Sequence, residues 1–412
     1  MRDSKDHFAI ALFDNLPSGG GKRAVYDFAK SLHRLGHRMD LYTLSTAALD
    51  YLPLDDFMEK KKVYDFAPGR HRFFYIENAY LKARDLGRLD SLCRRIAGDI
   101  NSGGYDLAFL QHCHIARSPM VLPYLRMPGV YYCQEPSRRF YEPPFPGKAP
   151  ASGGLKEGAK KLAWNMHYKK MKRLEERVVR HADVLLCNSR FSREAIRRAY
   201  GIEARVCYLS VDPDHFRPLG LPREDMLLTV GRLDVRKGHS FLIESLAKVK
   251  GIDRMRLVII ADSGCQETAE SLARMAEEKG VNLEILQGID EALLLQFYNR
   301  AKLLVYAPVL EPFGLVPLEA MACGTPVVGV REGGVRESVV DGETGLLTDR
   351  VTDEFAAAVT RLLNSPEECA RLGSQGRRHV MENWSPQKSA RELLSHFRHA
   401  VSAGDGAGHS EE

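Results

Sequence analysis

The sequence lacks any long apolar run: none of its 412 residues lies in a stretch approaching the roughly 20 consecutive apolar positions of a membrane-spanning helix. It also lacks a strong charge of one sign, because 59 lysines and arginines against 54 aspartates and glutamates leave a net charge of +5. These two absences argue against an integral membrane protein and against a dedicated nucleic-acid binder.

Disulfide and metal patterns are missing as well. The eight cysteines never form a CxxC pair, and the first residues, MRDSKDHFAI, show no secretory signal. We therefore expect reduced thiols, no zinc framework and a cytoplasmic location. What is present, 44% hydrophobic and 27% charged residues, is ordinary for a globular protein, and the length predicts about two or three domains.

Strands and helices alternate through the first half of the chain. An apolar run at 7–13 precedes a glycine-rich turn at 17–21, a segment with helical periodicity at 24–36 and a second strand at 37–44. One or two helices are expected within 45–100. Further strands are expected at 105–111, 129–134, 180–189 and 205–211, and a helix at 191–200. Strands and helices in this order predict a parallel sheet with right-handed crossovers.

The same order begins again after a polar stretch with three prolines at 211–225. Strands are expected at 226–233, 256–262, 283–288, 302–309 and 325–330, and helices at 240–250, 268–280 and 292–301. The pattern predicts an α/β protein with two consecutive doubly wound domains. The last residues, 403–412, are small and polar, and we expect them to be disordered.

The densest motif is EPFGLVPLEAMACGTPVV at 311–328, where a buried strand leads into a helix. Backbone N–H groups at such a helix start suit an anion such as phosphate. Glu311 and Glu319 flank this start and, as carboxylates, would accept hydrogen bonds from sugar or ribose hydroxyls. For an isolated pair, a loop charge and a solvent-facing helix residue are the simpler interpretation.

Two other loops lie where doubly wound folds bind ligands. VGRLDVRKGHS at 230–240 carries Arg232 and Lys237, two cations able to clamp a diphosphate and neutralise a leaving group. PSGGGKR at 17–23 allows the backbone to approach a ligand closely before a helix begins. The strand after it ends without the carboxylate that a dinucleotide site needs, so we interpret this loop as a wall facing a substrate.

Taken in order, these segments resemble the retaining glycosyltransferases of family 4, which have the GT-B fold: two doubly wound Rossmann-like domains facing across a cleft. The resemblance covers nearly the whole chain and is strongest over 226–348. The residues that carry it are Gly19-Gly20-Gly21, Asn188-Ser189 with Phe191, Val211-Asp212 with Phe216, Gly231-Arg232, Lys237-Gly238, the Glu311/Glu319 pair around Phe313-Gly314, and GGVRESVVDGETGLL at 333–347.

The resemblance implies a hexosyltransferase that uses a nucleotide-sugar as co-substrate, needs neither cofactor nor metal, and retains the anomeric configuration. Arg232 and Lys237 would hold the donor diphosphate, Glu319 the nucleotide ribose and Glu311 the transferred sugar. Backbone at Phe313-Gly314-Leu315 would support the sugar and the phosphate. UDP-hexose or GDP-hexose is the expected donor, and a glycan, lipid-linked or small-molecule hydroxyl is the expected acceptor.

On the acceptor side, the resemblance implies that the Gly19-Gly20-Gly21 loop faces the acceptor and that a histidine after the strand at 105–111 lies near the reacting sugar. The sequence offers His112 and His114, of which His114 lies nearer the next helix. The candidate catalytic residues are therefore Glu311, Arg232, Lys237 and His114.

In domain terms, the resemblance implies an acceptor-side domain at 1–217, a donor-binding domain at 218–384 and a last helix at 385–402 that packs back on the first domain. Asp212-Pro213-Asp214 looks like a metal-binding DxD motif, but its place in the hinge favours a structural turn. Two other functions stay open: a nucleotide-sugar epimerase on the same fold, and a sugar-binding module without catalysis.

One helical segment is strongly basic. Residues 155–181 carry nine lysines and arginines against three glutamates, a local charge of 9 − 3 = +6, interleaved with apolar residues that include Trp164. Such a helix favours contact with anionic lipid headgroups, which would place the protein on the inner face of a membrane. A solvated charged helix packed on the first domain explains it equally well, and no nucleic-acid recognition pattern is present.

Overall fold

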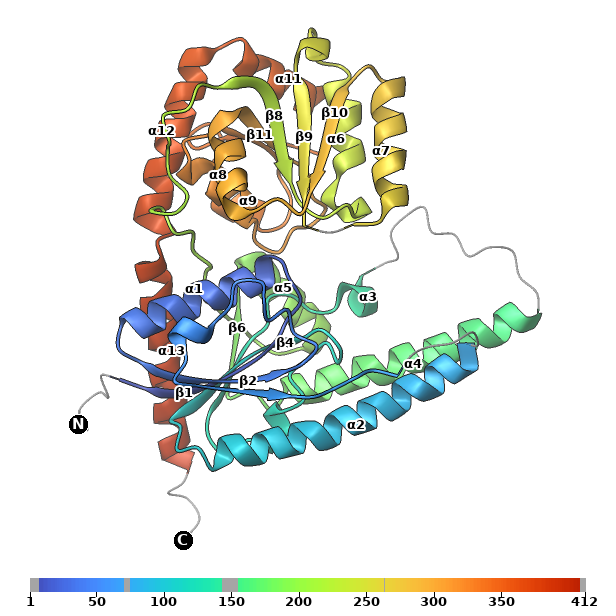
Figure 1. Cartoon of the computed structure of the whole chain (residues 1–412), viewed down its shortest axis with the longest axis vertical. Helices are drawn as coiled ribbons and strands as arrows, with labels where there is room; N and C mark the ends of the chain where they lie inside the picture. Colours follow the sequence, from blue (N-terminus) through green and yellow to red (C-terminus); the bar gives the residue numbers. More distant parts are fainter. Residues whose placement is uncertain (1–6, 70–74, 143–154, 263, 408–412) are drawn as a thin grey trace. The chain divides into compact units, whose positions relative to one another are not determined.

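The structure, a computed structural model of the chain, describes residues 7–69, 75–142, 155–262 and 264–407, and only the backbone of 75–83, 155–164 and 404–407. It divides into two compact units. Unit 1 comprises Met1–Asn188, Ser192–Cys207 and Ala390–Glu412, and unit 2 comprises Ser189–Phe191 and Tyr208–Ser389. Each unit contains one parallel sheet with helices around it, as the sequence predicts (Figure 1).

Unit 1 contains a seven-stranded sheet in the order β3-β2-β1-β4-β5-β6-β7. Its strands are β1 (Ala9–Asn15), β2 (Arg38–Leu44), β3 (Lys60–Tyr64), β4 (Leu107–Cys113), β5 (Gly129–Tyr132), β6 (Val184–Cys187) and β7 (Arg205–Val206). Its helices are α1 (Gly20–Arg34), α2 (Tyr75–Asn101), α3 (Arg138–Tyr141), α4 (Leu155–Val179), α5 (Arg190–Tyr200) and most of α13 (Pro386–Ala407). The long helices α2 and α4 run side by side (Figure 1).

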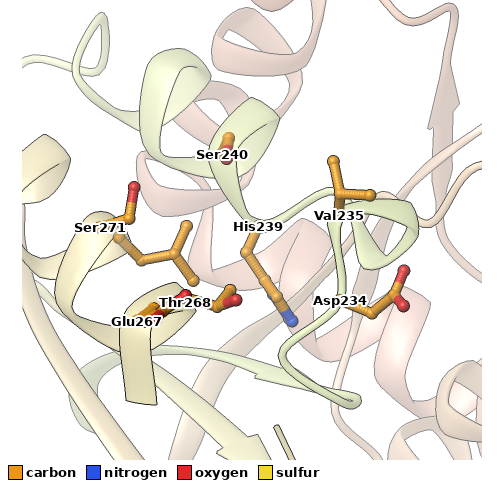
Figure 2. A pocket seen from close by; sticks show the side chains of 8 residues that line it. Asp234, Val235, His239, Ser240, Glu267, Thr268 and Ser271 are labelled. Carbon is orange, nitrogen blue, oxygen red and sulfur yellow. The ribbon is translucent and has the colours of Figure 1, made fainter. Parts of the chain in front are cut away.

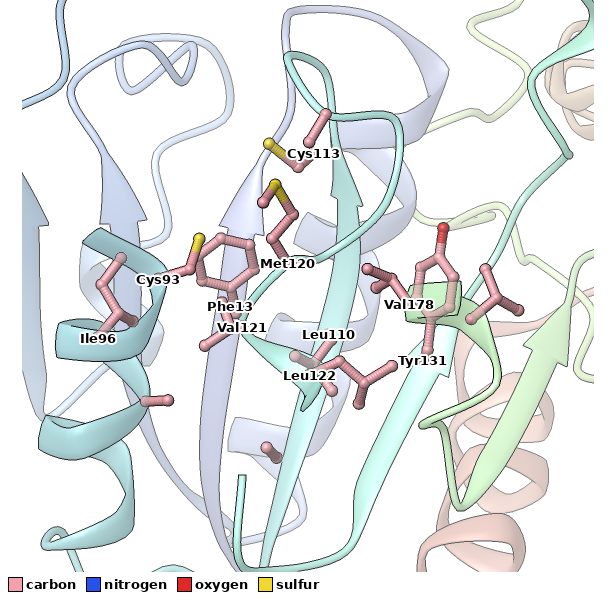
Figure 3. Packing of buried hydrophobic residues seen from close by; sticks show 14 of the residues in the cluster. Phe13, Cys93, Ile96, Leu110, Cys113, Met120, Val121, Leu122, Tyr131 and Val178 are labelled. Carbon is pink, nitrogen blue, oxygen red and sulfur yellow. The ribbon is translucent and has the colours of Figure 1, made fainter. Parts of the chain in front are cut away.

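Apolar side chains of alternating strand positions form the core of unit 1. Phe13 of β1 and Leu110 of β4 pack with Ile96 of α2 and Val178 of α4 on one side of the sheet (Figure 3). On the other side, Phe109 of β4 meets aromatic rings of α1 and α13, as described below for α13. Burial on both faces explains why these strands read as nearly continuous apolar runs.

Unit 2 contains a six-stranded parallel sheet in the order β10-β9-β8-β11-β12-β13. Its strands are β8 (Glu224–Val230), β9 (Arg256–Ala261), β10 (Asn282–Gln287), β11 (Ala301–Tyr306), β12 (Val327–Val330) and β13 (Leu346–Thr348). Its helices are α6 (His239–Leu246), α7 (Gln266–Glu278), α8 (Glu291–Arg300), α9 (Leu315–Ala322), α10 (Val335–Ser338), α11 (Thr352–Leu363) and α12 (Pro366–Asn383). Helices α6, α7 and α11 share one apolar cluster with the sheet.

The division between the units falls earlier than the expected boundary at 217/218. Unit 2 begins at Tyr208 because the proline-containing stretch packs on it: Phe216 lies against the ring of Tyr298, at 5.9 Å between ring centroids, and Leu219 N–H donates to the Asn299 side chain. Within this stretch, Asp212 Oδ1 accepts a hydrogen bond from the backbone N–H of Asp214 at 3.0 Å. The Asp212-Pro213-Asp214 segment therefore forms the structural turn that its place in the hinge predicts.

The last helix joins the two units in sequence. α13 begins at Pro386 in unit 2, and its residues from Ala390 onward belong to unit 1, where Phe397 packs on Phe109 with ring centroids 5.2 Å apart. The helix continues to Ala407, so the expectation of disorder from 403 is wrong for 403–407, and 408–412 lie outside the described residues. Across the described part of the chain, no helix has both the length and the apolarity to cross a membrane.

Candidate functional site

The carboxyl ends of β8 and β11 lie side by side in the sheet of unit 2. Between these two strands the strand order reverses: β9 and β10 extend the sheet in one direction, and β12 and β13 extend it in the other. Doubly wound sheets bind ligands in the crevice at such a switch point. The loops 231–238 and 307–314, which follow these strands, are therefore the first candidates for a site.

Glycine allows these two loops to approach each other. Gly238 has a φ of 71°, and a Cβ there would lie 1.9 Å from the carbonyl oxygen of Ala307. A second link is the hydrogen bond from the backbone N–H of Val309 to the carbonyl oxygen of Arg236, at 2.7 Å. The loop that carries Arg232 and Lys237 is thus held against the loop that carries Glu311.

The predicted cations and the first predicted carboxylate meet here. Lys237 Nζ lies 2.8 Å from Glu311 Oε2, and the two side chains are 24% and 19% exposed. Arg232 is exposed, and its guanidinium makes no ion pair or hydrogen bond with the residues that the structure describes. The site therefore holds one partly screened ion pair and one guanidinium open to an anion.

Two further glycines support the loop that carries Glu311. A Cβ on Gly333 would lie 2.2 Å from the carbonyl oxygen of Glu311, and one on Gly334 would lie 2.3 Å from that of Pro312. The backbone N–H of Gly334 donates to the Glu311 carbonyl at 2.7 Å. Only glycine fits at either position. This close approach explains why the motif at 333–347 begins with two glycines.

An aromatic cluster fixes the other side of the same loop. Phe313 is 2% exposed, and its ring lies 5.3 Å from that of Trp384 and 6.1 Å from that of Tyr208. Gly314, with a φ of 96°, then begins α9 at Leu315 without a side-chain cap. α9 thus begins shortly after Glu311 in the chain, and its first backbone N–H groups are the ones that the phosphate-support prediction concerns.

Glu319 lies inside α9 rather than on its solvent face. The residue is 5% exposed, and the hydroxyl of Tyr298 donates to its Oε2 at 2.5 Å. The interpretation of Glu319 as a solvent-facing residue is therefore wrong. A buried carboxylate held by a phenol has a fixed orientation, which suits recognition of a ligand hydroxyl.

In unit 1, the glycine loop occupies the equivalent switch point, between β1 and β4. Gly19, with a φ of 121°, precedes α1, whose first residues are Gly20 and Gly21. Gln134, after β5, donates from Nε2 to the carbonyl oxygen of Gly21 at 3.3 Å, and a Cβ on Gly21 would lie 3.3 Å from this same amide nitrogen. The glycine loop and Gln134 therefore meet beyond the carboxyl ends of β1 and β5.

The structure distinguishes the two candidate histidines. The backbone N–H and ring Nδ1 of His114 lie 3.1 and 2.9 Å from the carbonyl oxygen of Asn15, which attaches the ring to the end of β1. Burial, together with nearby Arg117 and His114, lowers the pKa of His112 to about 3. His112 is thus neutral at ordinary pH, and His114 is the histidine attached to the strand that leads into the glycine loop.

Sequence reasoning missed a buried ion pair below the glycine loop. Lys22 and Asp14 are 1% and 0% exposed and pair directly, and Asp14 also accepts a hydrogen bond from the backbone N–H of Leu16 at 3.2 Å. Burial raises the pKa of Asp14, and Lys22 opposes that rise. A lysine in the first turn of a helix normally reaches solvent, so nothing in the pattern indicated its burial.

Two family models match the chain in succession. The model "Glycosyltransferase Family 4" matches residues 18–215, and "Glycosyl transferases group 1" matches residues 211–379. Together they span both units and include every candidate residue described above.

Curated relatives match over part of their length. D-inositol 3-phosphate glycosyltransferase 2 of Catenulispora acidiphila is 32% identical over 241 residues, which are 52% of this chain and 56% of that protein. A GDP-mannose-dependent alpha-(1-6)-phosphatidylinositol monomannoside mannosyltransferase of Mycolicibacterium smegmatis is 33% identical over 255 residues, 55% of this chain and 66% of that protein. The chain thus spans little more than half the length of most of these relatives.

Solved structures share the fold across nearly the whole chain. A sucrose-phosphate synthase of Thermosynechococcus elongatus has a TM-score of 0.71 at 20% identity, covering 96% of this chain and 99% of that chain. HepE of Anabaena, in complex with UDP and glucose, has a TM-score of 0.71 at 20% identity, covering 95% and 99%. At this identity the likeness establishes the GT-B fold.

Proposed function

The chain belongs to the glycosyltransferases that the family 4 and group 1 models describe, and from this membership we propose that it moves a hexose from a nucleotide-sugar to an acceptor hydroxyl. The observation that carries the proposal is the Lys237–Glu311 pair beside the exposed guanidinium of Arg232, at the switch point of unit 2. This set combines positive charge for a diphosphate with a carboxylate for a hydroxyl-bearing sugar.

The donor is a nucleoside diphosphate hexose bound by unit 2. Arg232 can contact two phosphate oxygens through its planar fork, and the Lys237 ammonium has three donors, so it can hold a phosphate and Glu311 together. The buried carboxylate of Glu319 accepts a ribose hydroxyl. UDP and GDP are the favoured nucleoside diphosphates because one relative is named as GDP-mannose-dependent and one structural neighbour is in complex with UDP and glucose.

Transfer proceeds with retention and without a metal. The bond between the hexose anomeric carbon and the diphosphate oxygen breaks while the acceptor oxygen bonds to the same carbon on the same face, and the acceptor proton passes to the departing diphosphate. Arg232 and Lys237 stabilise the negative charge that develops on this leaving group. Such preorganised electrostatic stabilisation is expected to make the largest contribution to the rate. Glu311 and the backbone at 313–315 orient the sugar.

Unit 1 supplies the acceptor side. The close approach of the Gly19-Gly20-Gly21 loop to Gln134 makes a rigid wall, and His114 stands at the end of the neighbouring strand as the candidate that orients or polarises the acceptor hydroxyl. A lipid-linked acceptor agrees with α4, on which Lys169 and Lys170 are exposed and Met166 is 65% exposed. The side chains of Lys160, Lys161 and Trp164 lie outside the described residues.

The screening experiment is thermal unfolding of the full chain with UDP-, GDP-, ADP- and dTDP-sugars. A ligand at 100 times its Kd stabilises the folded state by about 2.7 kcal/mol, so the correct donor is expected to raise the midpoint clearly. Failure of every nucleotide-sugar to do so would refute the proposed donor site.

The second step distinguishes transfer from its rivals. A transferase releases free nucleoside diphosphate in step with acceptor concentration and yields a glycosylated acceptor. An epimerase converts the nucleotide-sugar without an acceptor, and a binding module leaves it intact. The cation and carboxylate set at 232, 237, 311 and 319 favours transfer, because a module without turnover has no need to stabilise a leaving diphosphate.

A further inference from the structure

A cavity of about 280 Å³ lies beside loop 231–238, next to helices α6 and α7. Its walls come from the middle of that loop, from the first turn of α6 and from the first two turns of α7 (Figure 2). Loop 231–238 thus has the Lys237–Glu311 pair at one side and takes part in this cavity through Asp234 and Val235. At this volume the cavity suits a molecule smaller than a nucleotide.

His239 is the most informative residue of the cavity wall. It is 3% exposed, and its Nε2 lies 3.0 Å from the carbonyl oxygen of Arg232. A carbonyl only accepts, so Nε2 carries the proton and Nδ1 is left as an acceptor. Nδ1 is buried and has no partner among the described residues. Burial lowers the pKa of His239, so the ring stays neutral and keeps this tautomer. The side chain extends between the loop and α7 (Figure 2).

The other polar groups of the wall select a ligand that donates hydrogen bonds. Among the described residues, the wall contains no lysine or arginine, and its carboxylates are those of Asp234 and Glu267. Asp234 is offset by Arg236, which donates to its Oδ1 from backbone N and from Nε, at 2.9 and 3.2 Å. Glu267 lies in the first turn of α7, where the helix dipole favours a negative charge. The carboxylates of Asp234 and Glu267 disfavour an anionic ligand, whereas a ligand hydroxyl can donate a hydrogen bond to them.

Two apolar groups complete the wall. Val235 is 57% exposed and Leu272 is 5% exposed, so the cavity offers aliphatic contacts as well as the hydroxyls of Ser240 and Ser271. A ring with several hydroxyls and C–H faces matches both kinds of surface. We propose that this cavity binds a free monosaccharide, or a polyol of the same size, whose hydroxyl donates to His239 Nδ1.

Occupation of the cavity acts on the donor loop. His239 holds the carbonyl of Arg232, so a ligand that fixes the imidazole also fixes the backbone from which the guanidinium of Arg232 extends. This half of the inference rests on the proposed function. Sugar and nucleoside diphosphate would then bind with positive coupling, and by linkage each would raise the affinity of the other by the same factor.

The first test measures sugar binding to the full chain without nucleotide. Calorimetric titration with glucose, mannose and myo-inositol is expected to give saturable binding of at least one of them. Ser271 is exposed, so Ser271→Leu should fold normally, fill the cavity mouth and abolish the binding, whereas the matched change Ser395→Leu on exposed α13 surface should keep it. Absence of binding by all three probes, or binding that survives Ser271→Leu, would overturn the cavity site.

The second test measures coupling. The Kd of UDP and of GDP is determined with and without the sugar that binds, and about a fivefold or larger tightening is expected, which His239→Phe should remove. Sugar binding without any change in nucleotide Kd would overturn the link through His239. Failure of both nucleotides to bind would refute the proposed function instead, while the sugar titration would still decide the cavity.

Discussion

Replacing Asp14 by asparagine is expected to destabilise unit 1 strongly, because it leaves the Lys22 ammonium buried without an anion. The two residues are 0% and 1% exposed, so neither side chain can turn to water. Removing one partner of a buried ion pair costs about 3–5 kcal/mol. At about 1.4 kcal/mol per factor of ten, the locally opened population should rise roughly a hundred- to several-thousand-fold.

Amide hydrogen exchange of the full chain measures this opening locally. Peptides from β1 and α1 should exchange faster in Asp14→Asn, while peptides from β8 and α6 in unit 2 serve as the internal reference. Lys22→Met should behave differently, because the remaining Asp14 can take up a proton. Its pKa is already raised by burial and rises further without Lys22. The native state then binds more protons than the unfolded state, so stability falls as pH rises through that folded pKa.

The penalty of Lys22→Met should therefore shrink as the pH is lowered towards 4, whereas that of Asp14→Asn should not shrink over the same range. A double variant, Asp14→Asn with Lys22→Met, should recover much of the loss because no buried charge remains. The reasoning is refuted if Asp14→Asn accelerates exchange less than tenfold, or if the double variant is as unstable as the two single losses added together.

Four further outcomes are expected. Lys237→Ala should lower kcat/KM by on the order of 10²-fold or more in steady-state assays, since one charge partner of the leaving group is lost; a loss below threefold would contradict that role. Glu319→Ala should weaken nucleoside diphosphate binding more than it slows turnover, and an unchanged calorimetric Kd would remove the ribose assignment. Turnover should persist in EDTA; complete loss, restored by Mg²⁺ or Mn²⁺, would replace the metal-free mechanism. The full chain should sediment with anionic vesicles at low salt and less so after Lys169→Gln with Lys170→Gln, because each nearby lysine contributes about 1 kcal/mol; a wild type that stays in the supernatant would leave α4 as a solvated helix.

The regular part of the fold was predictable because parallel strands buried on both faces read as apolar runs and their helices as periodic segments. Strand β3 was not, since its residues KKKVY are exposed except at Tyr64. Its strand conformation comes from backbone pairing with β2 at the sheet edge, which leaves no alternation in the sequence. The division at Tyr208 was not predictable either, because the segment that begins there packs on unit 2 through tertiary contacts, which composition does not encode.

The candidate site was predictable as a set of residues but not as an arrangement. Arg232, Lys237, Glu311 and Glu319 came from two motifs, and the structure explains their meeting by glycines whose missing Cβ lets loops touch, as at Gly238. The burial of Glu319 depends on Tyr298, which is supplied by α8 and belongs to no motif. That Nδ1 of His239 has no hydrogen-bond partner in the described part of the chain could likewise be found only from the folded arrangement.

Helix α13 has a consequence for biosynthesis. Near its middle, Phe397 contacts the ring of Phe8, with centroids 6.3 Å apart, and the ring of Phe109. The ribosome makes Phe8 and Phe109 hundreds of residues before it makes Phe397. Until α13 emerges, Phe8 and Phe109 lack these ring contacts, and the part of the sheet face that α13 covers is a surface for chaperones or for aggregation. A nascent chain arrested before residue 386 is therefore expected to leave part of its first sheet uncovered, and a fragment meant to fold as the first unit alone needs α13.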